Sequence, residues 1–425
     1  MKQINIKIIL LMLVLSSNIA FAQFGGGRGT AQSPYQIRAR EHIEELADSI
    51  RSKGATNFTF KKYFKLMNDI TDSVRCVIGE ANHYDYISDV YIYTDMFHSA
   101  TFDGQGHKIT LAIVSEGNAS LFGVTYRATI KNLRVDGYVK KNGNNGVRDF
   151  VREHGGLYAA AGIVGFAFNT EISNCVNYAN IYINANGYIS IGGIVGFMAK
   201  MDNYTSDLCS VSDCINFGNI EIPDIENSNY DRAVGGIAGE MHPIYIHPMY
   251  MPNILPTPIT NCINFGTLKY RFLIPHIYDH PDNPGLGGIL GKYIYSDFTT
   301  YAYRDPIIDS IYGDHTMSPL TLSTPEIENC INVGFIDGPG GGIVGTLSKD
   351  KDAFLSGGEI TNKLRIKNCI NAGFITGSGG GIVGGTTSSY PLRGGLTNQL
   401  TIENCINTGV LGNKPTNSGI ANIEK

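Results

Sequence analysis

Short apolar segments broken by Gly and Asn make up most of the chain beyond residue 100. Representative segments are Ile189–Ile191, Ile327–Ile331 and Leu364–Lys367. Short apolar or alternating runs bounded by turn residues are typical of β-strands. Helical spacing of apolar residues is absent throughout this region. The pattern therefore predicts an all-β chain of many short strands.

Two motifs alternate along the chain and define a repeat. The glycine box is a cluster of Gly around Ile, and it occupies residues 161–165, 192–196, 235–239, 287–291, 341–345 and 380–384. The Asn-Cys box reads Asn or Asp, Cys, Val or Ile, Asn, and its cysteines are Cys175, Cys214, Cys262, Cys330, Cys369 and Cys405. The intervals between these cysteines are 39, 48, 68, 39 and 36 residues, so the middle of the unit tolerates insertion. A unit this small cannot bury its own apolar face, and it must stack on its neighbours.

Stacked short strands predict a parallel β-solenoid, in which each strand pairs with equivalent strands about 4.8 Å away. The last residue of each Asn-Cys box is expected to stack amide upon amide and to satisfy backbone groups at a turn. A ligand role for these amides is the alternative. The residues are Asn177, Asn216, Asn264, Asn332, Asn371 and Asn407.

Six of the eight cysteines share one repeat position, which predicts a column of buried thiols. Disulfide-stapled secreted domains place their cysteines at unlike positions. Parallel Cβ vectors about 4.8 Å apart also exceed the ~3.5–4.5 Å that a disulfide prefers. Cys76 and Cys209 lie outside the column, and they are either paired or free. No zinc site is predicted, because the chain has no C-x2-C pair.

The N-terminal part predicts a short amphipathic helix over Glu41–Ile50. Ile43, Leu46, Ala47 and Ile50 have helical spacing within it. A helix at the start of a solenoid covers strand edges that would otherwise be unpaired.

A degenerate repeat unit follows this helix. Leu121–Gly123 stands where a glycine box would be, and Ile130–Gly137 stands where an Asn-Cys box would be. Leu133 then occupies the cysteine position, which indicates that this position points inward.

The chain resembles the GLUG-repeat family of bacterial secreted β-helix proteins. The N-terminal pattern of that family is matched at Gly27–Ile37, Asp69–Ile70, Phe102–His107 and Ile130–Val135, and the two boxes resemble its repeat motifs. The resemblance implies a single-stranded right-handed parallel β-helix of the pectate-lyase type. Such repeats occur on adhesin-like proteins and beside the catalytic part of an immunoglobulin-cleaving metalloprotease.

The first 22 residues predict a secretory signal peptide. Lys2 and Lys7 precede the apolar run Ile8–Leu15, and Ala20–Ala22 forms a cleavage signature before Gln23. No Cys stands at the cleavage point, and no later segment is apolar for the ~18 residues of a membrane span. The expected protein is secreted or exposed at the cell surface, without a transmembrane anchor.

The expected organisation is one continuous solenoid behind the signal peptide. Residues 1–22 are the signal peptide and residues 23–137 contain the cap and the first degenerate coils. Residues 138–425 contain the repeats, their long insertions and a closing segment.

Composition and charge narrow the function classes. The chain has 33 Lys and Arg against 38 Asp and Glu, so it lacks the basic surface that nucleic-acid binding requires. The H-E-x-x-H signature of zinc proteases is absent. His276 and His280 are four residues apart, but Pro275 and Pro281 flank them and disfavour a metal-binding helix. No cofactor is predicted.

Aromatic residues are concentrated in the insertions. Because insertions at equivalent corners project from the same side of a stack, they are expected to build one exposed platform or to cover the sheets. The residues are Tyr245, Tyr250, Tyr270, Tyr278, Tyr293, Tyr295, Tyr301 and Tyr303.

Three functions are consistent with the sequence. The first is an exported, non-catalytic, adhesin-like protein that binds a glycan or a cell-surface protein through the tyrosine platform. The second is a polysaccharide lyase or glycoside hydrolase that uses loop acids. The third is a structural spacer of a surface assembly.

Overall fold

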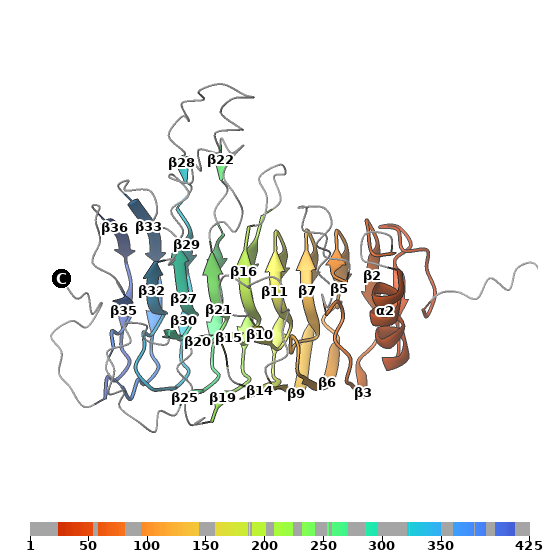
Figure 1. Cartoon of the computed structure of the whole chain (residues 1–425), viewed down its shortest axis with the longest axis horizontal. Helices are drawn as coiled ribbons and strands as arrows, with labels where there is room; N and C mark the ends of the chain where they lie inside the picture. The colour runs from red at the N-terminus through yellow and green to blue at the C-terminus, as the bar shows by residue number, and fades with distance from the viewer. Residues whose placement is uncertain are drawn as a thin grey trace, which may run out of the picture.

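The computed structural model describes residues 24–53, 58–80, 95–143, 158–185, 187, 189–200, 208–223, 232–242, 253–254, 257–270, 285–295, 321–322, 324–349, 360–377, 379–387 and 396–412. These ranges consist mainly of β-strands that pair in parallel, and their one helix, α2 (Arg40–Lys53), lies at the N-terminal end (Figure 1). The prediction of an all-β chain with parallel pairing and a short N-terminal helix is confirmed.

A ten-stranded sheet follows the chain from its first strand almost to its last. The strands lie in sequence order, so sheet neighbours come from adjacent units. They are β1 (Tyr35–Ile37), β2 (Tyr63–Leu66), β5 (Thr101–Asp103), β8 (Thr129–Lys131), β12 (Glu171–Ser173), β17 (Ser210–Ser212), β23 (Ile259–Thr260), β29 (Glu326–Glu328), β33 (Ile360–Lys367) and β36 (Leu396–Glu403).

A thirteen-stranded sheet has two branches. They meet at β9 (Arg134–Asn142), which is long enough to pair with both β13 and β14. One branch contains β13 (Val176–Asn177), β18 (Ile215–Asn216), β24 (Ile263–Asn264), β30 (Ile331–Asn332), β34 (Ile370–Asn371) and β37 (Ile406–Asn407). The other contains β14 (Asn180–Asn184), β19 (Ile220–Ile222), β25 (Leu268–Tyr270) and β31 (Ile336–Asp337). Strands β3 (Ile70–Val74) and β6 (Lys108–Ser115) complete the sheet.

Three further sheets contain the remaining strands. The eight-stranded sheet consists of β4 (Phe97–His98), β7 (Phe122–Tyr126), β11 (Val164–Phe168), β16 (Val195–Ala199), β21 (Ala238–His242), β27 (Leu290–Tyr295), β32 (Val344–Lys349) and β35 (Val383–Thr387). The four-stranded sheet consists of β10 (Tyr158–Ala161), β15 (Ile189–Gly192), β20 (Arg232–Gly235) and β26 (Gly285–Gly287). Strands β22 (Asn253–Ile254) and β28 (Thr321–Leu322) form a pair.

Equivalent residues of successive units pair with one another whatever the insertion between them. Val176 pairs with Ile215, and Ile215 pairs with Ile263. A one-residue slip would turn every side chain to the opposite face of the sheet, so the buried pattern holds this register. Insertions therefore change the path between strands without changing their alignment.

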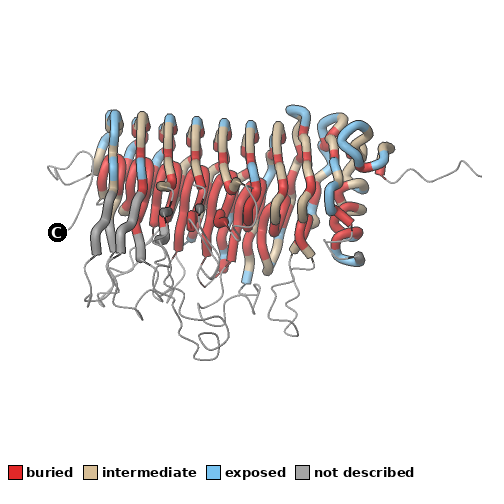
Figure 2. Tube along the Cα trace, turned by 90° about the horizontal axis from the view of Figure 1, so that it is seen from above, coloured by how far each residue is buried: buried red, intermediate tan, exposed pale blue. Residues whose placement is uncertain are grey.

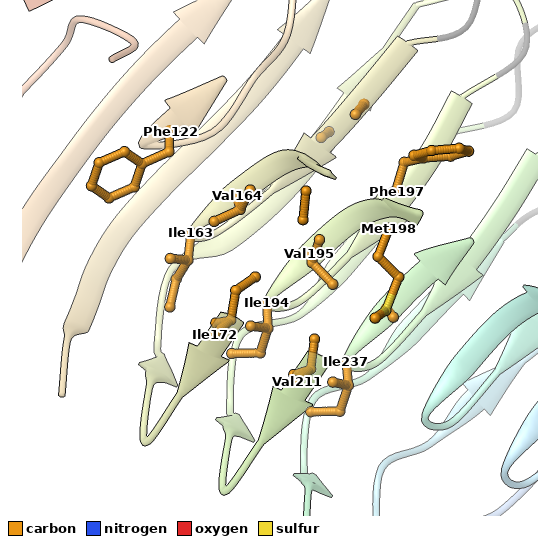
Figure 3. Close-up of a cluster of buried hydrophobic side chains, with 14 of the residues drawn as sticks. Phe122, Ile163, Val164, Ile172, Ile194, Val195, Phe197, Met198, Val211 and Ile237 are labelled. Atoms are coloured by element: carbon orange, nitrogen blue, oxygen red, sulfur yellow. The ribbon is translucent and has the colours of Figure 1, made fainter. Parts of the chain in front are cut away.

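The interior is filled by columns of aliphatic side chains. Ile163, Ile194 and Ile237 are the third residues of successive glycine boxes, and they lie one above another with no exposed surface (Figure 3). Ile172 and Val211 meet this column from the ten-stranded sheet (Figure 3). Full burial of one such side chain contributes about 1.5–3 kcal/mol. The core thus extends along the stack as a continuous band, and exposed residues recur along one edge (Figure 2).

Helix α2 buries the apolar face predicted from its sequence. Ile43, Leu46, Ala47 and Ile50 are all buried. The opposite face carries charged residues such as Arg40, whose Nε lies 3.3 Å from Glu44. The helix lies beside β3 at the end of the stack, where it acts as a cap (Figure 1).

Leu133 lies in the column of the box cysteines. Its carbonyl accepts a hydrogen bond from the N–H of Val176 at 2.8 Å, just as the carbonyl of Cys175 accepts one from Ile215 at 2.9 Å. Leu133 and Cys175 have no exposed surface. The position is therefore an apolar one that either residue fills.

All eight cysteines are free thiols. Cys76 and Cys209, whose state the sequence left open, are included. Burial raises the pKa of Cys209 to about 11, so this thiol stays protonated at neutral pH.

Candidate binding surface

An inner ladder of asparagines joins the units beneath the surface. Each amide donates from Nδ2 to Oδ1 of the next unit, and Asn177 and Asn216 are 2.8 Å apart in this way. Asn216 also accepts from the N–H of Gly218 and donates to its carbonyl, which settles the orientation of the amide. The ladder continues through Asn264, Asn332, Asn371 and Asn407 with distances of 2.8–2.9 Å.

An outer ladder consists of the Asn or Asp that precedes each cysteine. These residues have left-handed backbone with φ of 51–55°, a conformation that Asn and Asp tolerate better than most residues. Asn174 donates to Oδ1 of Asn132 at 2.8 Å, and Asn132 donates to the carboxylate of Asp103 at 2.9 Å. A carboxylate only accepts, so the amides of this ladder donate toward the preceding unit. The two ladders therefore have opposite directions.

The outer ladder is interrupted at one unit. The carboxylate of Asp213 accepts from Asn261 at 3.1 Å, but it has no hydrogen to donate to Asn174. Beyond this unit the ladder resumes through Asn329, Asn368 and Asn404 with distances of 3.1–3.3 Å.

Aromatic rings stack on the outer face of the thirteen-stranded sheet. Each of Tyr178, Phe217 and Phe265 directly follows an inner-ladder asparagine, and side chains alternate between the two faces of a strand. The centroids of Tyr178 and Phe217 are 5.0 Å apart, and those of Phe217 and Phe265 are 4.9 Å apart, with planes within 3° of parallel. Phe335 and Phe374, two positions further along their units, stack at 5.4 Å.

These rings belong to a larger exposed surface, which we call the apolar strip. Its members are 36–59% exposed, and they are Tyr178, Phe217, Phe265, Val333, Phe335, Phe374, Ile406 and Val410. A column of partly exposed aliphatic side chains flanks them, formed by Val176, Ile215, Ile263, Ile331 and Ile370. Contiguous exposed apolar surface of this kind marks interaction sites more often than scattered apolar residues do.

Polar residues border the apolar strip on both sides. The outer ladder follows one border. The other carries Glu221 and Lys269, whose charged atoms are 3.2 Å apart, and Asp337, which accepts from the Thr376 hydroxyl at 3.0 Å. An apolar centre with a polar rim is the usual anatomy of a protein interface.

The tyrosines predicted to form a platform are placed differently. Tyr270 and Tyr293 are buried, so these two rings are not part of an exposed platform, and they agree with the alternative that the tyrosines pack against the sheets. They are buried because each lies in a column of inward-facing residues. Tyr270 pairs with the buried Ile222, and Tyr293 pairs with the buried Met241. Tyr295 is the last residue of β27. The remaining five, Tyr245, Tyr250, Tyr278, Tyr301 and Tyr303, lie outside the described residues, as do His276 and His280.

A buried charged group lies between the four-stranded and eight-stranded sheets. Glu240 is 1% exposed, accepts from the Ser190 hydroxyl at 2.7 Å and lies 2.5 Å from Nε2 of His242. Burial raises the pKa of Glu240, but His242 and the charge of Lys292 outweigh it and lower that pKa below its ordinary value. The group is enclosed, and the bond between Ser190 and Glu240 links the two sheets away from solvent.

Among the described residues, no helix has the length and apolar character needed to cross a membrane. Within the same ranges, no three His, Cys, Asp or Glu side chains are grouped so that they would hold a metal ion.

The apolar strip was not predicted from the sequence. Its signal is the aromatic residue after the asparagine in three successive Asn-Cys boxes, at Tyr178, Phe217 and Phe265. Aligning the units by box and comparing the following position reveals this recurrence.

The described part thus defines a mostly β protein of parallel sheets with an exposed apolar surface. No family model matches the chain, and no curated protein matches it. Among solved structures, it is similar to the crystal structure of a candidate immunoglobulin A1 protease from Bacteroides ovatus. The two are 16% identical with a TM-score of 0.42, over 92% of this chain and 80% of that one.

Proposed function

We propose that this protein is an exported, non-catalytic, adhesin-like binding protein whose contact surface is the apolar strip. The single observation that carries the proposal is the strip itself, in which large apolar side chains remain exposed in aligned columns between two polar borders. A sheet face with no partner would favour polar residues at these positions.

The proposed architecture is a right-handed parallel β-helix of the GLUG-repeat kind. It is supported by the strand order, since successive units add strands in turn to the ten-stranded sheet and to the branches of the thirteen-stranded sheet. Parallel strands joined by a crossover have a right-handed connection in about 98% of cases.

Ring geometry favours a protein partner over a glycan. Sugar rings bind aromatic residues by stacking on an open ring face, and both faces of Phe217 are occupied by Tyr178 and Phe265. The stack of Tyr178, Phe217 and Phe265 therefore presents ring edges to solvent, with the aliphatic column beside them. This surface complements the apolar face of another protein.

Export is proposed from the N-terminal sequence. The charged start at Lys2, the apolar run Ile8–Leu15 and the Ala20–Ala22 signature form a signal peptide. N-terminal sequencing of the exported protein is expected to begin at Gln23.

Binding of the mature protein to cells tests the function. The mature protein and a triple variant with Tyr178→Ser, Phe217→Ser and Phe265→Ser are compared on intact cells, on protease-treated cells and on glycan arrays. We expect binding to intact cells, loss of binding after protease treatment, and at least a ~10-fold weaker interaction for the variant, since central aromatic residues dominate interfaces.

Phe60→Ser is the matched control, because Phe60 is an exposed ring at the N-terminal end, away from the strip. It is expected to bind like the parent. Array binding that the triple variant retains, or equal binding of parent and triple variant to cells, would refute the strip as the contact.

A further inference from the structure

The polar border of the apolar strip alternates in charge. Tyr182, Glu221, Lys269 and Asp337 occupy one column in four successive units, as the strand pairing shows. The column therefore reads hydroxyl, negative, positive, negative along the stack. If a second copy presents the same column in reverse order, each group meets a complementary one. Tyr182 then lies opposite Asp337, and Glu221 lies opposite Lys269.

A two-fold axis parallel to the strands produces this reversal. We place this axis in front of the sheet, between the units of Phe217 and Phe265. The second copy then has its units in the reverse order, and each column of one copy faces the same column of the other. Glu221 then faces Lys269 of the second copy, and Lys269 faces Glu221 of the second copy.

The column of Tyr178, Phe217, Phe265 and Val333 matches under the same operation. Phe217 faces Phe265 of the second copy, and Tyr178 faces Val333 of the second copy. Tyr182 lies opposite Asp337 of the second copy, where its hydroxyl can donate to the carboxylate. Strands of the two sheets become parallel across the interface, which is an aligned sheet-on-sheet packing.

The matched part of the strip forms the centre of such an interface. A ring of 150–250 Å² that is ~40% exposed leaves roughly 60–100 Å² in contact with solvent. The three rings Tyr178, Phe217 and Phe265 together expose roughly 180–300 Å². Val333 and the aliphatic column beside them enlarge this centre, and the polar borders must supply the rest of the ~800 Å² per partner of a standard specific interface.

We infer that the apolar strip docks onto the same strip of a second copy of this chain, in a symmetric dimer held by ring contacts at the centre and by Glu221–Lys269 pairs at the border. The inference rests on the proposed function and names the partner of that site, so the protein that the strip binds on cells is another copy of this chain. Two-fold interfaces use one surface twice, so a single substitution acts at two places in the dimer.

Charge reversal separates contacts between copies from contacts within one copy. Glu221→Lys and Lys269→Glu each place like charges opposite one another in a homodimer, and each alone is expected to weaken dimerisation by ~10-fold or more. Mixed in equal amounts, the two variants restore opposite charges across the interface, and a heterodimer is expected. An effect confined to the pair within one copy would not recover on mixing.

Sedimentation of the mature protein at micromolar concentration gives the readout. The parent is expected to be a dimer, and Phe217→Asp is expected to weaken it by roughly 100-fold, because the ring lies at the centre and acts twice. Arg365→Glu is the matched control, since Arg365 forms a comparable exposed pair with Glu326 on the ten-stranded sheet. It is expected to leave the dimer intact.

A monomeric parent, a dimer that Phe217→Asp leaves unchanged, or variants that do not recover on mixing would each overturn the dimer. Failure of the dimer is distinguishable from failure of the proposed function. A monomer whose binding to cells still depends on Tyr178, Phe217 and Phe265 would refute the dimer and support the binding function.

Discussion

Gly193 lies directly against the amide of Asn216. A Cβ at residue 193 would stand 2.4 Å from Cγ of Asn216 and 2.2 Å from the carbonyl oxygen of Gly236. The same relationship recurs between Gly236 and Asn264 in the next unit. The glycine box and the Asn-Cys box are therefore two halves of one contact, in which the absence of a side chain makes room for the inner ladder.

Gly193→Ala is expected to destabilise the protein by about 3 kcal/mol, because the new methyl group meets backbone and a hydrogen-bonded amide that cannot move aside. Urea denaturation followed by circular dichroism measures this change. Gly385→Ala is the control, since a Cβ there meets no atom of the described residues within 4 Å, and it is expected to change stability by less than ~0.5 kcal/mol. Equal effects of the two substitutions would contradict the steric explanation.

Asp213→Asn is expected to stabilise the protein by about 1 kcal/mol. The amide would keep the bond from Asn261 and gain one to Oδ1 of Asn174, which restores the outer ladder where the carboxylate interrupts it. Asn also suits the left-handed backbone at this residue. A rise in the midpoint of thermal unfolding is the readout. Asp213→Ala removes the existing bond and should lower that midpoint, and a lower midpoint for Asp213→Asn would disprove the proposed gain.

Lys141 is expected to make stability depend on pH above neutrality. Burial lowers the pKa of its amine to about 8, against an ordinary value of 10.5, while its Nζ donates to the carbonyls of Glu116, Asn142 and Gly143. Between these pH values the unfolded chain binds more protons than the folded one, so the free energy of unfolding rises with pH.

Comparison with Lys141→Met isolates this effect. The stability of the parent relative to the variant should increase from pH 8 to pH 10, as measured by urea midpoints. Lys140→Met removes a neighbouring, partly exposed amine and is the control for the loss of one positive charge. A constant difference between the parent and Lys141→Met across this range would rule out a lowered pKa.

The cysteines are expected to resist alkylation in the native protein. Six of them are buried, and only Cys76 and Cys405 are partly exposed. Because burial raises the pKa of Cys76 to about 11, even this thiol should react slowly at neutral pH. Mass spectrometry should show little labelling in the folded state and eight labels in concentrated guanidinium chloride. Rapid labelling of Cys214 or Cys262 in the native protein would contradict their burial.

The features that repeat in every unit could be predicted from the sequence. The shared positions of Cys175 and Asn177 within their boxes indicated stacked columns, because a residue type that returns at a fixed place in each unit faces its equivalents in the next. The substitution of Leu133 for cysteine indicated that this column is apolar. The helical spacing of Ile43, Leu46 and Ile50 likewise predicted α2.

Features that depend on contacts between residues far apart in the sequence could not be predicted in this way. The burial of Tyr270 follows from pairing with Ile222, which is 48 residues away in the chain. The direction of the outer ladder depends on the carboxylate of Asp103, which belongs to a unit without an Asn-Cys box. The apolar strip was not predicted, because a Phe after Asn is compatible with either an inward or an outward position until the strand and its alternation are known.

The repeating donors and acceptors of the two amide ladders have a consequence for how such a protein lengthens. A unit with Asn at both ladder positions can receive one hydrogen bond and give one along each ladder, so a copy of such a unit carries donors and acceptors that match its neighbours. Gene duplication can therefore add turns one at a time without redesigning those already present.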